Sequence, residues 1–128
     1  MNFSYSPGGL PFVEISLTNQ AHTTTKSALV DSGSTINVLP YEDGLDLGLS
    51  WEDQRVLLKD EGFLKGTPVY AVLLSAQLAT YHPVQLAFAW TRKSRNEVRL
   101  ILGQTNFFQH FEVTFRGKEG IFTITPNP

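Results

Sequence analysis

Short stretches that alternate apolar and polar residues recur along this chain, and turn-forming residues separate them. Within residues 11–18, Val13, Ile15 and Leu17 alternate with polar side chains, which is the period of a strand buried on one face. After a polar turn at 19–23, residues 24–30 have the composition of an antiparallel partner strand. The pattern therefore predicts a mostly β domain that begins with a hairpin.

The rest of the chain continues this pattern of short elements. Residues 36–40 read as a short strand that Pro40 ends, and residues 41–49 as a short helix. Gly62 and Gly66 bracket a polar segment between two β-rich arms, which predicts a long hairpin over 53–78 with its tip at 59–66. The other expected elements are strands at 83–90 and 98–102, a short helix at 104–111 with Thr105 as its N-cap and Phe107 and Phe108 toward the core, and a closing hairpin over 112–125.

Two segments of the chain repeat one arrangement. Residues 27–34 and residues 98–105 each run from a hydrophobic strand into a turn that contains glycine. Each is followed by a short helical or hydrophobic element. Two such halves suggest a pseudo-symmetric β fold.

The length and composition are those of one globular domain. With 128 residues, 41% of them hydrophobic, the chain can bury one core, so we expect a single domain over residues 1–128 with its core at about 10–126. The net charge of -2 is spread without long blocks of one sign, which argues against nucleic acid as a partner. The basic cluster of Arg92, Lys93 and Arg95 is interpreted as a solvated loop.

The residue types that commonly hold metals form no motif here. The chain has no cysteine, and its three histidines, His22, His82 and His110, lack ligand spacing. The N-terminal residues lack the basic and apolar regions of a signal peptide, and the apolar stretches are shorter than the roughly 20 residues of a membrane span. We therefore expect no metal, no organic cofactor, no membrane partner and a cytoplasmic location.

An acidic residue interrupts the apolar segment at 28–40. Asp-Ser-Gly is a good turn sequence, because aspartate accepts hydrogen bonds from the nearby backbone and glycine tolerates positive φ. Here, however, Asp31 follows Leu29 and Val30 and precedes a second apolar run at 36–39. A carboxylate between buried segments needs hydrogen-bond donors, and these follow at once in Ser32, Gly33, Ser34 and Thr35. Both a surface turn and a partly buried acid placed for catalysis fit this string.

Three features in this order resemble the aspartic proteases, specifically the single-domain retropepsin-like group in its bacterial form. They are the string Leu-Val-Asp-Ser-Gly-Ser-Thr at 29–35, a glycine-containing hairpin at 57–70 that matches the family's flap, and the strand end Ile-Leu-Gly at 101–103. The closing helix and hairpin at 107–126 also look like those of bacterial members, so the resemblance covers about residues 10–126. It implies a closed, barrel-like β fold with a flap hairpin and one or two short helices.

The resemblance also implies an aspartic endopeptidase. In such enzymes two carboxylates share one proton, so that one activates a water molecule while the other protonates the carbonyl oxygen. This chain offers one candidate, Asp31, because its other aspartates lack the apolar pair before them and the hydroxyl and glycine residues after them. The second carboxylate must then be Asp31 of another copy, which requires a homodimer.

The same resemblance assigns roles to the neighbouring residues. Ser32 donates across the dimer interface, Gly33 lets the backbone approach partner and substrate, and the Ser34 hydroxyl donates to the outer carboxylate oxygen. Such a donor favours the ionised carboxylate and predicts an acidic pH optimum. The residues expected to contact a peptide or protein substrate are Ile36 and Ile101 in the cleft and Gly62, Phe63 and Leu64 in the flap. Mostly apolar pockets favour hydrophobic residues beside the cleaved bond.

Two other interpretations stay open. A retropepsin-like fold can persist as a catalytically silent module for dimerisation or peptide binding. An unrelated β-barrel can carry Asp-Ser-Gly as a plain turn. The chain also continues well past its closing helix, unlike viral proteases that dimerise through interleaved terminal strands, so a smaller interface of active-site loops and flaps is expected.

Overall fold

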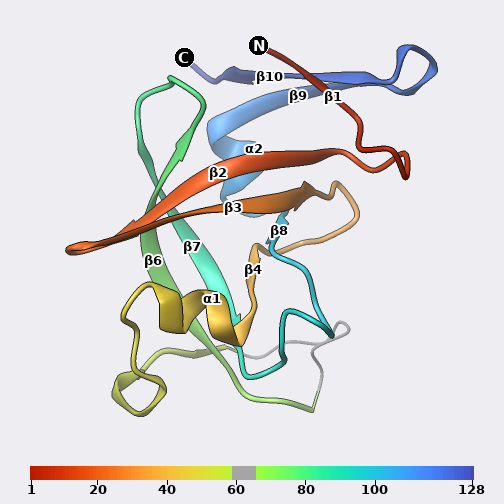
Figure 1. Ribbon diagram of the computed structural model, residues 1–128. Coiled ribbons are helices and arrows are strands. Elements are labelled where there is room, and N and C mark those ends of the chain that lie inside the picture. The colour runs from red at the N-terminus through yellow and green to blue at the C-terminus, as the bar shows by residue number, and fades with distance from the viewer. Residues whose placement is uncertain (59–65) are drawn as a thin grey trace.

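The computed structural model describes residues 1–58 and 66–128, which form two β-sheets (Figure 1). The larger sheet has the order β2 (Phe12–Asn19), β3 (His22–Val30), β8 (Ile101–Leu102), β4 (Val38–Leu39), β7 (Val84–Thr91), β6 (Val69–Leu78) and β5 (Leu57–Leu58). Because β2 also pairs with β6, the described strands from β2 round to β6 close into a barrel, with β5 outside the ring. The expected mostly β, closed barrel-like fold is confirmed.

The smaller sheet lies over one end of the barrel. It has the order β1 (Asn2–Ser4), β10 (Ile121–Pro126) and β9 (Phe111–Arg116), and the two chain termini lie close together beside it (Figure 1). The short helix α2 (Phe107–His110) leads into β9, and α1 (Tyr41–Asp46) lies at the other end of the barrel (Figure 1). Two 3₁₀ turns, η1 (Trp51–Asp53) and η2 (Gly117–Glu119), complete the described elements.

Alternation along the first hairpin builds one wall of the core. Val13, Ile15 and Leu17 of β2 are buried while Glu14 is exposed, as the sequence pattern predicts. β3 pairs with β2 over its whole length, from Phe12 opposite Leu29 to Asn19 opposite His22. The apolar faces of both sheets and the buried aromatic ring of Phe107 form one large cluster. Burial of this surface is the main term that holds the barrel closed.

The long hairpin is present at its base. Leu57 pairs with Tyr70 and Leu58 with Val69, which confirms two antiparallel arms. Of its predicted tip at 59–66, residues 59–65 lie outside the described residues, and with them the three flap residues Gly62, Phe63 and Leu64 and their expected contact with substrate.

Two details of the sequence prediction are wrong or incomplete. Thr105 is not the N-cap of α2: Asn106 holds that position with φ 81° and ψ -61°, and its side-chain Oδ1 accepts the Ala87 backbone N–H at 2.8 Å. Asn106 thus serves the barrel strand β7 instead of capping the helix. The three-residue strand β1 was not expected, because it carries no extended alternation and pairs with β10 more than a hundred positions later.

Two further findings on residues 1–58 and 66–128 concern membrane spans and metal ions. Within these ranges, every helix is too short or too polar to cross a membrane. Within the same ranges, no group of three or more histidine, aspartate or glutamate side chains is placed so that it could hold a metal ion.

Candidate active site

Asp31 stands at the end of β3, where this strand runs parallel to β8. Leu29 and Val30 pair with Ile101 and Leu102, and the Asp31 backbone N–H donates to the Leu102 carbonyl at 2.9 Å. The two segments that repeat one arrangement in the sequence therefore lie side by side. Their strands end together, so the residues that follow each strand meet at one edge of the barrel.

The loop after Asp31 is a tight turn held by the aspartate itself. The Gly33 N–H donates to Asp31 Oδ1 at 2.9 Å, and the Ser34 N–H donates to the Asp31 carbonyl at 3.1 Å. Gly33 does not have positive φ, which corrects the reason for a glycine here. A Cβ on Gly33 would lie 3.2 Å from Asp31 Oδ1, so close approach to the carboxylate is the feature that favours glycine.

The hydroxyl residues of the loop divide into two kinds. Ser34 Oγ donates to the Ile36 carbonyl at 2.7 Å, so its hydrogen is not directed at the Asp31 carboxylate and the role expected for it is wrong. Ser32 and Thr35 are exposed. Within the described residues, the Ser32 hydroxyl forms no hydrogen bond, which leaves it available to a second molecule.

The segment after β8 pins this loop from the other side. Gln104 N–H donates to the Ser34 carbonyl and Thr105 N–H to the Thr35 carbonyl, both at 2.8 Å. The Gln104 side chain adds a third bond, from Nε2 to the Ser32 carbonyl at 2.7 Å. The Asp31 loop is therefore held by two backbone hydrogen bonds and by one from the Gln104 side chain. Gln104 was not singled out from the sequence, because its partner lies 72 positions away.

A buried amide links this loop to the barrel. Asn37 is 1% exposed; its Nδ2 donates to the Ala87 carbonyl at 2.9 Å and its Oδ1 accepts the Gly103 N–H at 2.7 Å. A buried polar group is stable when its donors and acceptors are paired in this way. Asn37 was also missed by the sequence reasoning. The available signal was a lone amide between Ile36 and Val38 in an otherwise apolar strand.

The Asp31 carboxylate lies between two hollows in the surface. One, of about 470 Å³, is lined by Leu29, Asp31, Ile101 and the segment 95–99. The other, of about 390 Å³, is lined by Leu29, Asp31, Ser32 and the apolar residues Leu10, Pro11, Val30 and Phe115. The side chain is half-buried, so it can meet both a neighbouring molecule and water.

The two cleft residues expected to contact substrate come together under the base of the hairpin. Ile36 and Ile101 belong to a small apolar cluster, separate from the main core, whose other members are Val38, Leu58, Val69, Ala89 and Val98. Ile101 is 8% exposed and Ile36 is half-buried. Ile101 lines the hollow of about 470 Å³ beside Asp31, whereas Ile36 lines a separate apolar pocket of about 210 Å³ together with Leu58.

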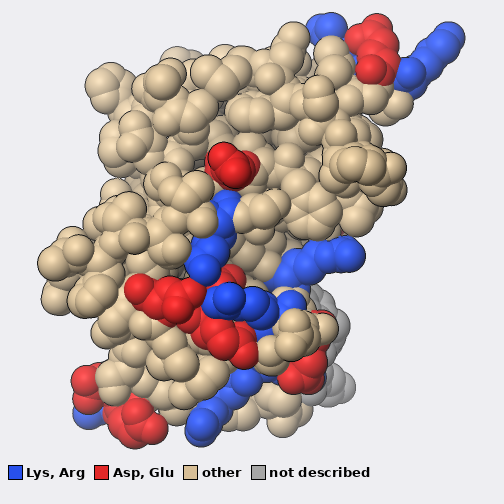
Figure 2. Space-filling view, in the orientation of Figure 1, with Lys and Arg blue, Asp and Glu red and all other residues tan. Residues whose placement is uncertain are grey.

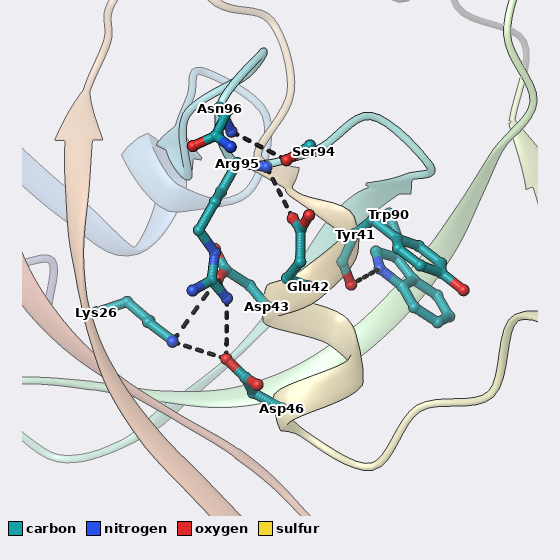
Figure 3. A network of polar contacts seen from close by, with 9 residues as sticks. All are labelled: Lys26, Tyr41, Glu42, Asp43, Asp46, Trp90, Ser94, Arg95 and Asn96. Carbon is teal, nitrogen blue, oxygen red and sulfur yellow. Dashed lines mark hydrogen bonds and ion pairs between the residues drawn. The ribbon is translucent and has the colours of Figure 1, made fainter.

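Figure 2 shows a cluster of charged side chains near the middle of the drawn face, apart from smaller charged groups at its upper right and lower left. Arg95 Nη2 lies 2.8 Å from Asp43 Oδ1 and 3.0 Å from Asp46 Oδ2. Lys26 of β3 lies 2.8 Å from the same Asp46 oxygen, and the Arg95 backbone N–H donates to Glu42 at 2.8 Å (Figure 3). This network ties the segment between β7 and β8 to α1.

The three basic residues lie in a loop in which Arg92 and Arg95 are exposed, as the interpretation of a solvated loop expects, but two of them also have partners that this interpretation did not foresee. Arg95 is an anchor in the ionic network. The Arg92 guanidinium lies over the rings of Tyr41 and Trp51, at 5.4 Å and 5.5 Å from their centroids. Both contacts join elements that are far apart in sequence, and a local charge pattern does not reveal them.

The acidic members of this network differ in environment. Burial raises the pKa of Asp43, and Arg95 and Lys26 oppose this only in part. The hydrogen bond from Lys26 lowers the pKa of Asp46, with a further contribution from Arg95. The backbone N–H of Arg95 lowers the pKa of Glu42.

Opposite pKa shifts predict opposite pH dependence for two asparagine variants. Asp43 has a raised pKa, so its contribution to stability is fully present below its unfolded value of 3.8 and is lost as pH rises through the folded value. Asp46 has a lowered pKa, so its contribution is present above 3.8 and is lost as pH falls through the folded value.

Urea unfolding at a series of pH values measures both effects. We expect the stability of the wild type relative to Asp43→Asn to grow as pH falls toward 3.8. Relative to Asp46→Asn, it should shrink as pH falls below 3.8. The same pH dependence for the two variants would contradict the environments assigned to the two carboxyls.

Comparison with known proteins places the fold. No family model matches the sequence, and no curated protein matches it. A crystal structure of a retropepsin-like aspartic protease from Rickettsia conorii matches with a TM-score of 0.67 and 11% sequence identity, over 97% of this chain and 90% of that one. At this identity the likeness shows the fold alone. The chain therefore has a retropepsin-like fold, with Asp31 directly after β3, in a loop that hydrogen bonds from Gln104 and Thr105 hold.

Proposed function

We propose that this protein is an aspartic endopeptidase that acts as a homodimer, with one Asp31 from each copy. One observation supports the proposal most directly. The half-buried Asp31 carboxylate lies between two hollows, in a loop held by hydrogen bonds, on a retropepsin-like fold. A surface turn needs neither the bonds from Gln104 and Thr105 nor a hollow on each side. Such rigidity is what a catalytic carboxylate requires.

In the proposed reaction the two Asp31 carboxylates share a single proton. The ionised one removes a proton from a water molecule as the water attacks the peptide carbonyl carbon, and the protonated one donates to the carbonyl oxygen. The tetrahedral intermediate then breaks its C–N bond as the leaving nitrogen receives a proton. Because two adjacent carboxylates share a proton only on the acid side of neutrality, we expect an acidic pH optimum.

The second copy is expected to dock against the loop of the first. The exposed Ser32 hydroxyl is in a position to donate to that copy. The strand β1 pairs with β10 of its own chain, and β10 lies between β1 and β9, so β10 already has a partner on each side and β1 has one. An interface made mainly from the active-site loops is small, and we therefore expect weak dimerisation.

Substrates are expected to bind in an extended conformation, with hydrophobic residues near the cleaved bond. The apolar cluster around Ile36 and Ile101 supports this preference, because it supplies an apolar floor next to the Asp31 loop. Gly33 leaves room for the substrate backbone beside the carboxylate.

The proposal is tested by following hydrolysis of a hydrophobic peptide library from about pH 4 to about pH 7 over a wide range of protein concentrations. Cleavage is expected to be faster at the acidic end. Its rate should rise more steeply than in proportion to protein concentration, since only dimers are active. A rate strictly proportional to concentration down to strong dilution, with unchanged specific activity, would contradict a weak active dimer. A folded wild type that cleaves no peptide would favour the silent binding module.

A further inference from the structure

The larger hollow beside Asp31 combines an apolar base with a charged wall. Leu29, Val98 and Ile101 contribute apolar side chains to its lining. Val98 and Ile101 are 7% and 8% exposed, so they form a fixed surface. The segment 95–99 also lines this hollow and carries two arginines and a glutamate. A bound molecule can pair only with those of the three charged side chains that have no partner within the protein.

Two of the three charged groups are occupied within the protein. The Arg95 guanidinium points toward α1, where Asp43 and Asp46 balance it at 2.8 Å and 3.0 Å (Figure 3). The Glu97 carboxylate turns back on its own loop and accepts the Ser94 N–H at 3.4 Å. That contact is long, so Glu97 is held only weakly.

Arg99 is the third group, and within the described residues it has no carboxylate partner. Its guanidinium lies over the ring of Phe12, 5.6 Å from the centroid. A ring in this position holds the guanidinium by cation–π attraction without neutralising it. The side chain is exposed and lines both the hollow beside Asp31 and a neighbouring one that reaches Lys26.

An arginine supported by a ring and lacking an acidic partner is suited to bind a carboxylate. Its planar fork can donate two parallel hydrogen bonds to one carboxylate group. The side chain that fits an apolar base and a cationic rim has a hydrocarbon stem and an acidic end. Glutamate has this form, with two methylene groups before its carboxylate.

We propose that the hollow between Asp31 and the segment 95–99 selects a glutamate side chain of the substrate, with Arg99 as the residue that determines this specificity. The inference rests on the proposed function, because it takes peptides to bind beside Asp31. It narrows the substrate class from hydrophobic peptides to peptides that carry one acidic residue close to the cleaved bond.

The test uses peptides of one cleavable sequence in which glutamate, glutamine or lysine is placed in turn at each position near the cleaved bond. At one position, the wild type is expected to cleave the glutamate peptide about three to ten times more efficiently than the lysine peptide, as kcat/KM. Arg99→Gln should remove most of this ratio and Arg99→Glu should invert it. Glu97→Gln should increase it, since an acidic neighbour is removed.

Arg116→Gln is the matched control, because it also removes one positive charge but lies on β9, where its nearest carboxylate is Glu119 at 3.9 Å. It should leave the ratio unchanged. If Arg99→Glu still cleaves the peptides but keeps the wild-type ratio of glutamate to lysine cleavage, the inference is overturned.

Failure of the proposed function can be told apart from failure of this inference, because no cleavage would then depend on Asp31. In that case the fluorescence anisotropy of the same labelled peptides decides the matter. Preferential binding of the glutamate peptide that is lost in Arg99→Gln supports the inference, and equal or absent binding of the glutamate and lysine peptides contradicts it.

Discussion

Replacing Asp31 with asparagine is expected to lower peptide cleavage by at least about a thousandfold and to leave thermal unfolding unchanged. Asparagine has the shape of aspartate and keeps an oxygen that can accept the Gly33 N–H, so the turn at 31–34 should persist. It cannot remove a proton from water or share one with a second carboxyl group. The effect is therefore on the chemistry, and kcat/KM together with the unfolding temperature measures it.

A matched control separates this effect from a general loss of charge. Asp53→Asn changes an exposed aspartate in η1, away from the Asp31 loop, and should cleave at the wild-type rate. Undiminished cleavage in Asp31→Asn would show that another group or another protein is responsible. Equal losses in both variants would show that charge, and not the position of Asp31, matters.

Replacing Gly103 with alanine is expected to destabilise the fold by about 3 kcal/mol and to reduce cleavage strongly. A Cβ at this buried position would press on the carbonyl oxygens of Ile36 and Ser34. These are backbone atoms of the segment after Asp31 and cannot rotate away like the end of a side chain. The loop must move, which strains the bonds from Gln104 to Ser34 and from Gly103 to Asn37.

Thermal unfolding measures the effect, with an expected fall of about 10 °C. Gly8→Ala is the control, since a Cβ there meets only the Ser6 hydroxyl at 4.0 Å. It should change the unfolding temperature by little. If Gly103→Ala unfolds at the wild-type temperature with full activity, the contact between the two loops is not the constraint described above.

The larger features of the fold could be predicted because they are local. The β2–β3 hairpin follows from strict alternation around Val13, Ile15 and Leu17, and the closing hairpin from two short β segments around a glycine-rich turn. The strand β1 could not be predicted in this way. It is three residues long, and its partner β10 is at the far end of the chain.

In the candidate site, too, local features could be predicted and long-range contacts could not. Asp31 and the hydroxyl residues after it form a continuous string, so the loop could be recognised from sequence. The residues that hold this loop, Asn37 and Gln104, act through bonds that span 66 and 72 positions. Nothing in their immediate neighbourhood signals those partners. The direction of the Ser34 hydroxyl was likewise a matter of geometry, since Asp31 and the Ile36 carbonyl are both within a few residues.

The charged residues were the least predictable. Arg95 reads as part of a basic loop, yet its charge is balanced by Asp43 and Asp46 of α1, about fifty positions earlier in the chain. Arg99, which the sequence places in the expected strand at 98–102, has no such partner within the described residues. Only the packing of the 92–99 segment against α1 distinguishes the two arginines.

The central claim is that activity needs two Asp31 carboxylates from two chains, and mixing tests it most directly. Wild type and Asp31→Asn are combined in varying ratio at constant total protein, so that the total number of dimers stays the same. In an equal mixture about one quarter of the dimers carry two carboxylates, so activity should fall to about one quarter of that of the pure wild type. A fall to one half, in proportion to the wild-type share, would contradict the shared site.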